Sequence, residues 1–167
     1  MPNASRIETR LRILPEWADL NGHMNVAYYV LAFDRATDVF YDALGIGWDY
    51  VRREQKSLFA LAINVDYVRE VVAGDGVRIA TRLLDHDHKR IHYFHEMVHA
   101  GTGWLAATNE LLAMHVEMAT RKSTPFPDDV VARLAAMQSA HAALPPPAQL
   151  GRKLGIRRGE PGPSGNP

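Results

Sequence analysis

The feature of this sequence that most constrains its fold is a change in the spacing of its apolar residues near residue 57. Before that point, side chains suited to one buried helix face recur every three or four residues: Val26, Tyr29, Val30, Phe33, Thr37, Phe40 and Leu44. After it, large apolar residues take alternate positions, as Leu61, Ile63, Val65 and Tyr67 do, which places them on one face of a strand. The sequence therefore predicts one long helix over 25–44, followed by a run of strands.

The rest of the chain supplies further strands and a second helix. Alternation and turn signals predict strands at 6–14, 61–67, 77–83, 90–100 and 104–118, and helical spacing returns over 127–143. This order favours an α+β fold in which a five-stranded antiparallel sheet wraps around the long central helix, with the C-terminal helix outside. We expect a single domain over 1–143, followed by a disordered tail rich in Pro, Gly and Arg over 144–167.

Composition excludes several classes of function. The chain has no cysteine, which excludes disulfides, thiolate nucleophiles and cysteine-based metal sites. Its 19 basic and 19 acidic residues balance, which argues against broad binding to nucleic acid or to an anionic membrane. No apolar run approaches the length that crosses a bilayer, and we expect a cytoplasmic protein. Histidines are frequent over 86–95, but strand neighbours point to opposite faces, so we predict no metal site there.

The segment that carries candidate chemistry lies immediately before the long helix. It contains an acid, an amide, a glycine and an imidazole in close succession: Asp19, Asn21, Gly22 and His23. The first backbone N–H groups of a helix lack intrahelical partners and favour an anion or a developing oxyanion. Asn25, or Asn21 if the first turn is irregular, would cap the helix, and Gly22 permits a sharp turn. The sequence thus predicts a carboxylate beside free backbone donors.

This segment resembles a known signature. Asp19-x-Asn21-Gly22-His23-Met24-Asn25, with Tyr28 or Tyr29, is similar to the Asp-x-x-Gly-His-hydrophobe-Asn-x-x-x-Tyr pattern of hotdog-fold acyl-CoA thioesterases of the 4-hydroxybenzoyl-CoA thioesterase type. The resemblance covers residues 8–120 and implies the hotdog fold. Within that group, the chain is most similar to betainyl-CoA thioesterases of carnitine breakdown, through the segments 13–17, 85–92 and 141–145.

The resemblance implies a role for each residue of the segment. Asp19 would be the general base or the nucleophile, Asn21 would orient it or the attacking water, and His23 would bind the thioester carbonyl or brace the loop. Backbone N–H groups from Gly22 to Val26 would bind the oxyanion, Val26 above all. The reaction would need no cofactor apart from the coenzyme A that the substrate carries, and no metal.

Other residues are candidates for binding the substrate. Trp17 and Tyr28, together with Trp48, are candidates for an aromatic cage around a quaternary ammonium group. Asn64 is a substrate-binding candidate in the strand after the helix, where related sequences often carry an acid two positions earlier and this chain has Ala62. The basic turn residues Lys89 and Arg90 would pair with the phosphates of coenzyme A.

Several alternatives stay open at this level. Asp34 and Asp38 on the long helix are rival bases, although their position opposite the apolar face favours solvated or interface roles. A hotdog enoyl-CoA hydratase would also place an acid and a histidine by the helix, and a non-catalytic acyl-CoA binding module is a third possibility. A single sheet of this size leaves an edge and a face exposed, which predicts a homodimer or a homotetramer.

Overall fold

The computed structural model describes residues 6–156. Its elements in chain order are β1 (Ile7–Arg12), the short 3-10 helix η1 (Pro15–Trp17), α1 (Val26–Ala43), α2 (Trp48–Glu54), β2 (Lys56–Tyr67), β3 (Gly76–His86), β4 (Arg90–His99), β5 (Leu105–Glu117), β6 (Lys122–Ser123) and α3 (Asp128–Ala142). The long helix, the strands that follow it and the C-terminal helix stand where the periodicity predicts them. The short elements η1, α2 and β6 carry too few residues for periodicity to reveal.

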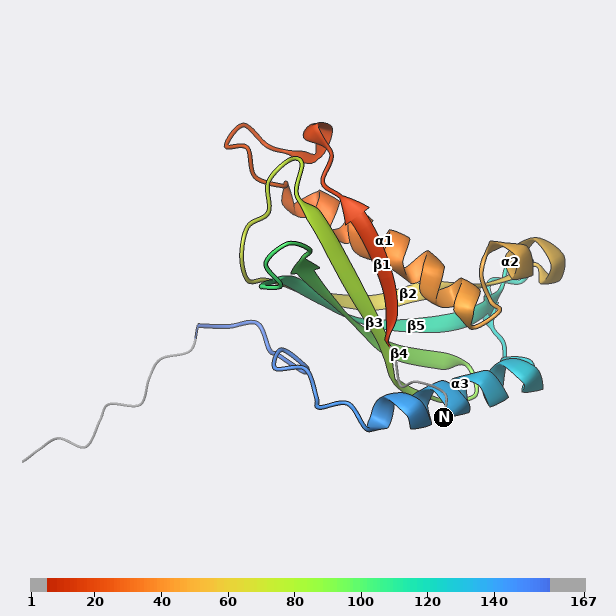
Figure 1. The fold of residues 1–167 in the computed structure, drawn as a ribbon. Coiled ribbons are helices and arrows are strands. Elements are labelled where there is room, and N and C mark those ends of the chain that lie inside the picture. Colours follow the sequence, from red (N-terminus) through yellow and green to blue (C-terminus); the bar gives the residue numbers. More distant parts are fainter. Residues whose placement is uncertain (1–5, 157–167) are drawn as a thin grey trace, which may run out of the picture.

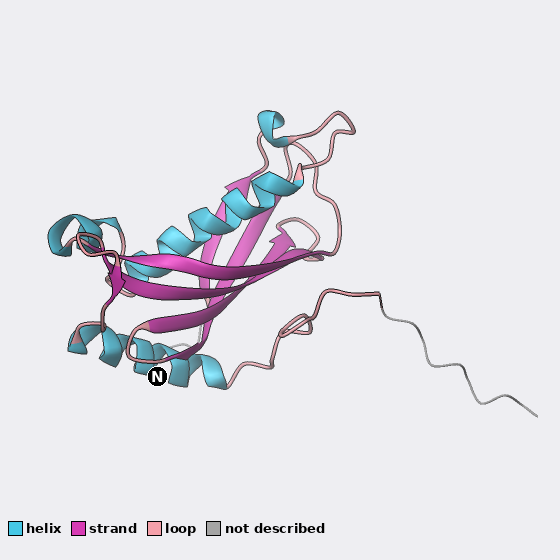
Figure 2. Cartoon of the chain, turned by 180° about the vertical axis from the view of Figure 1, so that it is seen from behind, coloured by secondary structure: helices cyan, strands magenta, loops and turns pink. Residues whose placement is uncertain are grey.

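The strands form one antiparallel sheet, in the order β1-β3-β4-β5-β2, with β6 paired to β5. The sheet curls around α1, as Figure 1 shows, and α3 lies on the opposite face, which is clear from behind in Figure 2. This arrangement confirms the predicted α+β fold with a long helix wrapped by an antiparallel sheet. The two-residue strand β6 is the one addition to the five strands expected.

One face of α1 packs into the concave side of the sheet. Its buried residues are Tyr29, Ala32, Phe33, Ala36, Thr37 and Phe40. Val26 and Val30 belong to the predicted apolar face but are 59% and 36% exposed. The reason is their position beside β2, the edge strand of the sheet: Val30 lines a cleft between α1 and β2, and Val26 lies against Tyr67 at the end of β2. No described strand covers the helix beyond that edge.

A buried histidine connects α1 to the middle of the sheet. The ring of His95 on β4 is fully buried and stacks on Phe33, with the ring centres 5.6 Å apart. Its Nε2 lies 3.0 Å from Thr37 Oγ1 on α1, and its Nδ1 lies 2.8 Å from Thr81 Oγ1 on β3. Burial lowers the pKa of His95 to about 3. The imidazole is therefore neutral, and it positions the helix through hydrogen bonds as well as apolar contact.

The edge strand β2 departs from strict alternation. Its register against β5 shifts between Ala60 and Ala62, so Leu61 is an extra residue at a bulge. The strand is largely uncovered: Phe59, Leu61, Ile63 and Tyr67 are 42%, 50%, 46% and 50% exposed. Natural proteins normally cover a long edge strand that exposes apolar side chains.

The outer face of the sheet is covered by α3 and by the residues that follow it. Val130 and Leu134 of α3 are buried in the cluster that includes Phe40 and Tyr93. Residues 144–156 continue along the same face, where Arg82 donates a hydrogen bond to the carbonyl of Pro145. The remainder of the predicted tail, 157–167, lies outside the described residues. Across 6–156, no helix is both long and apolar enough to span a membrane.

Candidate active site

The segment from Trp17 to Asn25 forms a closed loop against the N-terminus of α1, called here the Asp19 loop. Ala18 and Met24 form an antiparallel bridge across it, and the Asn25 N–H donates to the Trp17 carbonyl at 2.9 Å. At the tip, Gly22 has φ +81° and its N–H donates to the Asp19 carbonyl at 3.0 Å. That left-handed conformation is easily adopted by glycine and strained for other residues. The loop geometry therefore depends on the glycine that the sequence singles out.

The carboxylate of Asp19 is oriented by the backbone of its own loop. Its Oδ1 accepts hydrogen bonds from the N–H groups of Asn21, at 2.8 Å, and His23, at 3.3 Å. The side chain is nevertheless exposed. Asn21 contributes to this arrangement through its backbone N–H. A carboxylate held in this way is fixed in direction and still open to a substrate or to water, which a base or nucleophile requires.

An open backbone donor lies beside the loop, at the start of α1. Asn25 is the helix cap, because its Oδ1 accepts from the Ala27 N–H at 3.0 Å and its carbonyl accepts from the Tyr28 N–H. Over residues 6–156, the N–H of Val26 has no hydrogen-bond acceptor. It is the first N–H of an 18-residue helix, where the helix dipole adds partial positive charge. The structure thus offers a donor for an oxyanion at the predicted residue.

His23, Tyr67 at the end of β2 and Glu70 in the segment after it support this loop. His23 Nε2 lies 3.3 Å from Glu70 Oε2, and His23 also bridges to Val72 through the backbone. Tyr67 donates from its hydroxyl to the Val26 carbonyl at 3.3 Å. His23 therefore braces the loop in this structure. The sequence does not reveal the roles of Glu70 and Tyr67. Nothing in the alternation of β2 shows that the end of this strand and the segment after it meet the loop.

Trp17 and Tyr28 pack against each other below the loop. Trp17 is 3% exposed, its ring stacks on Tyr28 with centres 5.7 Å apart, and the guanidinium of Arg35 lies 4.9 Å from its ring centre. The aromatic faces of Trp17 are thus already in use. The third cage candidate, Trp48, lies on α2 at the other end of α1 and is 58% exposed. The structure does not bring the three rings together.

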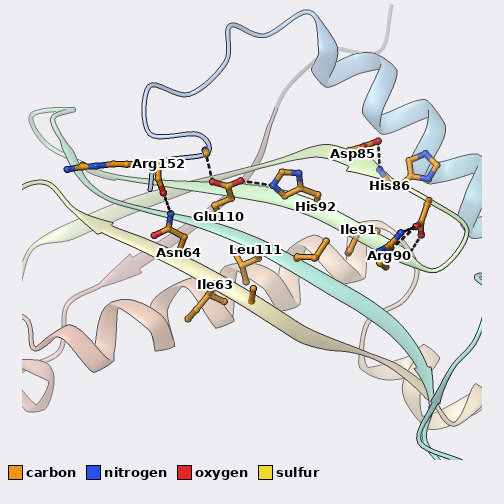
Figure 3. Close-up of a pocket in the computed structure, with 14 residues that line it drawn as sticks. Ile63, Asn64, Asp85, His86, Arg90, Ile91, His92, Glu110, Leu111 and Arg152 are labelled. Carbon is orange, nitrogen blue, oxygen red and sulfur yellow. Dashed lines mark hydrogen bonds and ion pairs between the residues drawn. The ribbon is translucent and has the colours of Figure 1, made fainter. Parts of the chain in front are cut away.

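Asn64, Lys89 and Arg90 lie away from the loop in the same chain. Asn64 and Arg90 line a cleft of about 650 Å³ on the outer face of the sheet, which Figure 3 shows. In it, the Asn64 amide donates to the Arg152 carbonyl at 2.7 Å. Lys89 lies in the turn that joins β3 to β4, and its Nζ donates to Ser123 Oγ on β6 at 3.3 Å. The Asp19 loop contacts the residues that precede β3, so it and this turn lie at opposite ends of that strand.

The turn of Lys89 and Arg90 is held by an aspartate. Burial alone would raise the pKa of Asp87, but hydrogen bonds from the Lys89 N–H and from Arg90 outweigh it and lower the pKa to about 2. Arg90 Nε donates to Asp87 Oδ2 at 2.7 Å. The Arg90 charge is thus already paired within this chain. Within the described part of the chain, no three acidic or histidine side chains are grouped so as to hold a metal ion.

Known proteins with similar sequences identify the family of this chain. The family model of the thioesterase-like superfamily matches residues 13–134. The betainyl-CoA thioesterase of Pseudomonas aeruginosa is 38% identical over 144 residues, which cover 86% of this chain and 91% of that protein.

Two solved structures share the fold closely. A Staphylococcus aureus protein in complex with CoA superposes with a TM-score of 0.85 at 28% identity, over 91% of this chain and 96% of its own. A candidate thioesterase from Pseudomonas putida superposes with a TM-score of 0.80 at 30% identity, over 95% of this chain and 99% of its own.

Proposed function

The chain belongs to the thioesterase-like superfamily, and from this premise we propose that it hydrolyses betainyl-CoA to betaine and free coenzyme A. The observation that carries the chemistry is the Asp19 carboxylate, held by two backbone N–H groups beside the unpaired N–H of Val26. The acyl group is proposed from the similarity to the Pseudomonas aeruginosa enzyme, of which this chain covers 91%.

The reaction divides between these two groups. Acting as a base, Asp19 takes a proton from water while the water oxygen attacks the thioester carbon. The carbonyl oxygen then becomes an oxyanion, and the N–H of Val26 donates to it. When the C–S bond breaks, the thiolate of coenzyme A leaves and takes up the proton. Direct attack by a carboxylate oxygen of Asp19 would pass through an anhydride that water hydrolyses to the same products. No cofactor takes part in either route.

A second copy of the chain belongs to this proposal. β2 and β1 are the edges of the sheet, and they differ in character. β1 is six residues long and carries Glu8, Arg10 and Arg12, and charged short strands protect an edge. β2 is twelve residues long and exposes apolar side chains along its length. We therefore place the dimer contact at β2, paired antiparallel with β2 of the partner.

Such a pairing joins different parts of the two protomers. A two-fold axis sets the Tyr67 end of one β2 beside the Lys56 end of the other. The Tyr67 hydroxyl is hydrogen-bonded to the Val26 carbonyl, beside the Asp19 loop. The Asp19 loop of one protomer therefore approaches the first half of β2 in its partner. The turn with Lys89 and Arg90 lies at the Lys56 end of β2. Arg90 on β4 pairs with Met114 on β5, and Met114 pairs with Phe59 on β2. These two side chains stay our candidates for the coenzyme A phosphates, across the interface.

A thiol-release assay over a panel of acyl-CoA substrates tests the function. The proposal predicts the highest kcat/KM with betainyl-CoA and lower values with acetyl-, benzoyl- and palmitoyl-CoA. Crotonyl-CoA, followed by the loss of its enoyl absorbance, tests hydration in parallel. A preference for aromatic or long-chain acyl groups would overturn the betaine assignment. Hydration without thiol release would select the hydratase, and coenzyme A binding without any turnover would select a binding module.

A further inference from the structure

A cleft between α1, α2 and the edge of the sheet has no role in the chemistry described above. It encloses about 400 Å³. Its lining combines apolar, aromatic, amide and carboxylate side chains, including Asp34, Asp38, Tyr41, Trp48, Tyr93 and Asn109. No lysine, arginine or histidine is among the described residues that line it. We call it the inner cleft, because it lies on the α1 side of the sheet.

We propose that the inner cleft binds the quaternary ammonium group of the acyl chain, and that it does so for a thioester held at the Asp19 loop of the partner protomer. This inference rests on the proposed function and on the dimer through β2. It assigns Asp38 and Trp48 a role in selecting the substrate, separate from the hydrolytic step.

The charge of the inner cleft favours a cation. Asp34 and Asp38 lie one turn apart on α1, so their carboxylates share a side of the helix. Burial raises the pKa of Asp38, while a hydrogen bond from the Trp48 indole opposes that shift and the nearby charges of Asp34 and Asp42 add to it. A positive group in the cleft would relieve the repulsion between these carboxylates. A quaternary ammonium has no N–H groups, so it loses less hydration on entering the cleft than an ammonium that carries N–H groups.

Asn109 provides independent support for a ligand in the inner cleft. It lies on β5, is 1% exposed and lines the cleft. Its Oδ1 has no hydrogen-bond partner among the described residues. Buried carbonyl oxygens almost always have a partner, so an unpartnered one in a cleft indicates that a positively polarised group or a water completes it. The methyl groups of a quaternary ammonium carry such polarisation.

The aromatic side chains of the inner cleft have the character of an ammonium site. Trp48 is 58% exposed, so much of its surface is not used in the core. Tyr41 and Tyr93 lie deeper and are joined by their hydroxyl groups at 2.9 Å. Aromatic faces attract quaternary ammonium groups through their quadrupole, and tryptophan does so most strongly. Of the three candidates for a cage, Trp48 is the most exposed, whereas Trp17 is buried and Tyr28 stacks on it.

The distance from Asp19 explains why the partner protomer is needed. Asp38 lies twelve residues after Val26 on α1, which is roughly 18 Å along the helix. In betaine one methylene separates the nitrogen from the carbonyl carbon, so the Val26 N–H and the Asp38 carboxylate of one chain cannot hold the two ends of the same acyl group. The inner cleft is also lined by Ser57, Leu58 and Ala60 of β2. Antiparallel β2 pairing would bring this half of the strand to the Tyr67 end of the partner, where the partner's Asp19 loop lies.

The test compares betainyl-CoA with tert-butylacetyl-CoA, in which a carbon atom replaces the ammonium nitrogen. The two acyl groups have the same shape and differ in charge. We expect Asp38→Asn to lower the ratio of kcat/KM for betainyl-CoA to that for the neutral substrate by about tenfold, since the attraction between a partly buried carboxylate and a cation is lost. We expect Trp48→Leu to lower the same ratio by about threefold to tenfold, and Trp48→Phe to restore part of it.

Asp49→Asn is the matched control. It removes one negative charge from the residue next to Trp48, and Asp49 points to solvent, where it pairs with Arg52. The inference predicts that this variant keeps the parent's ratio. Equal effects of Asp38→Asn and Asp49→Asn on the ratio would overturn it. So would an Asp38→Asn variant that loses activity equally on both substrates, because that result indicates a base or a structural role.

The parent enzyme separates failure of this inference from failure of the proposed function. If the parent does not prefer betainyl-CoA over its neutral analogue, the proposed substrate is wrong. If it does, and the ratio is unchanged in Asp38→Asn and Trp48→Leu, the substrate stands and the inner cleft is not its ammonium site. Thermal unfolding of each variant, followed by circular dichroism, identifies any that fail to fold, and the Trp48→Phe and Trp48→Leu pair then decides the outcome.

Discussion

The buried imidazole of His95 makes the stability of this fold depend on pH. Its pKa is about 3 in the folded chain, against an ordinary value of 6.5, because burial disfavours the charged form. The unfolded chain therefore binds a proton that the folded chain does not, as pH falls from 6.5 toward 3. Stability from this residue is complete above that window and is lost within it. Between pH 7 and pH 5, the free energy of unfolding should fall by about 2 kcal/mol through His95 alone.

Urea unfolding at pH 7, 6 and 5, at one fixed protein concentration, measures this loss. His95→Gln removes the titrating ring and keeps a side chain that can contact Thr37 or Thr81. We expect this variant to be less stable than the parent at pH 7 and to lose about 2 kcal/mol less than the parent between pH 7 and pH 5. His115 adds to the parent's loss in the same direction, because burial lowers its pKa as well.

The control is His88→Gln, which removes an imidazole from an exposed turn. It measures the effect of losing any one histidine from the chain. If the free energy of unfolding of His95→Gln falls as steeply with pH as that of the parent, the reasoning is refuted. A steep fall that disappears in His88→Gln would refute it equally.

Three further predictions concern the loop and the dimer. Gly22→Ala places a side chain at φ +81° and should cost about 1 kcal/mol of stability while lowering kcat, and a variant with the parent's kcat would show that the turn is not needed. Asn25→Ala should cost about 1 kcal/mol through loss of the helix cap, measured by urea unfolding, and no loss would contradict the cap. Leu61→Lys should shift the dimer toward monomer in sedimentation and lower activity. Leu154→Lys, at an exposed position off the strand, is the control and should do neither. A dimeric and active Leu61→Lys variant would exclude β2 as the interface.

The sequence was most informative where local chemistry decides the structure. The spacing of Tyr29, Phe33 and Phe40 predicts the buried face of α1, because each repeat of that spacing contacts the same sheet. The helix cap at Asn25 and the turn at Gly22 were also predictable, because each depends only on contacts between residues that are close in the sequence.

Contacts between distant segments were not predictable in this way. The pairing of His23 with Glu70 joins residues on two separate segments, and only the folded sheet brings them together. The inner cleft is a further case, because Asp38 and Asn109 come from α1 and β5 and neither stands in a recognisable motif. Asn64 shows the converse: its strand was predicted, but its side chain lies on the outer face, where it contacts Arg152.

The central claim is that Asp19 performs the hydrolysis, and one substitution tests it most directly. Asp19→Asn keeps a side-chain oxygen that can accept from the Asn21 and His23 N–H groups, so the loop should persist while the base or nucleophile is lost. Glu16→Gln makes the same change of charge at an exposed residue just before the loop. In a thiol-release assay with betainyl-CoA, kcat should fall at least about a hundredfold in Asp19→Asn and stay at the parent's value in Glu16→Gln. An Asp19→Asn enzyme that turns over at the parent's rate would contradict the account.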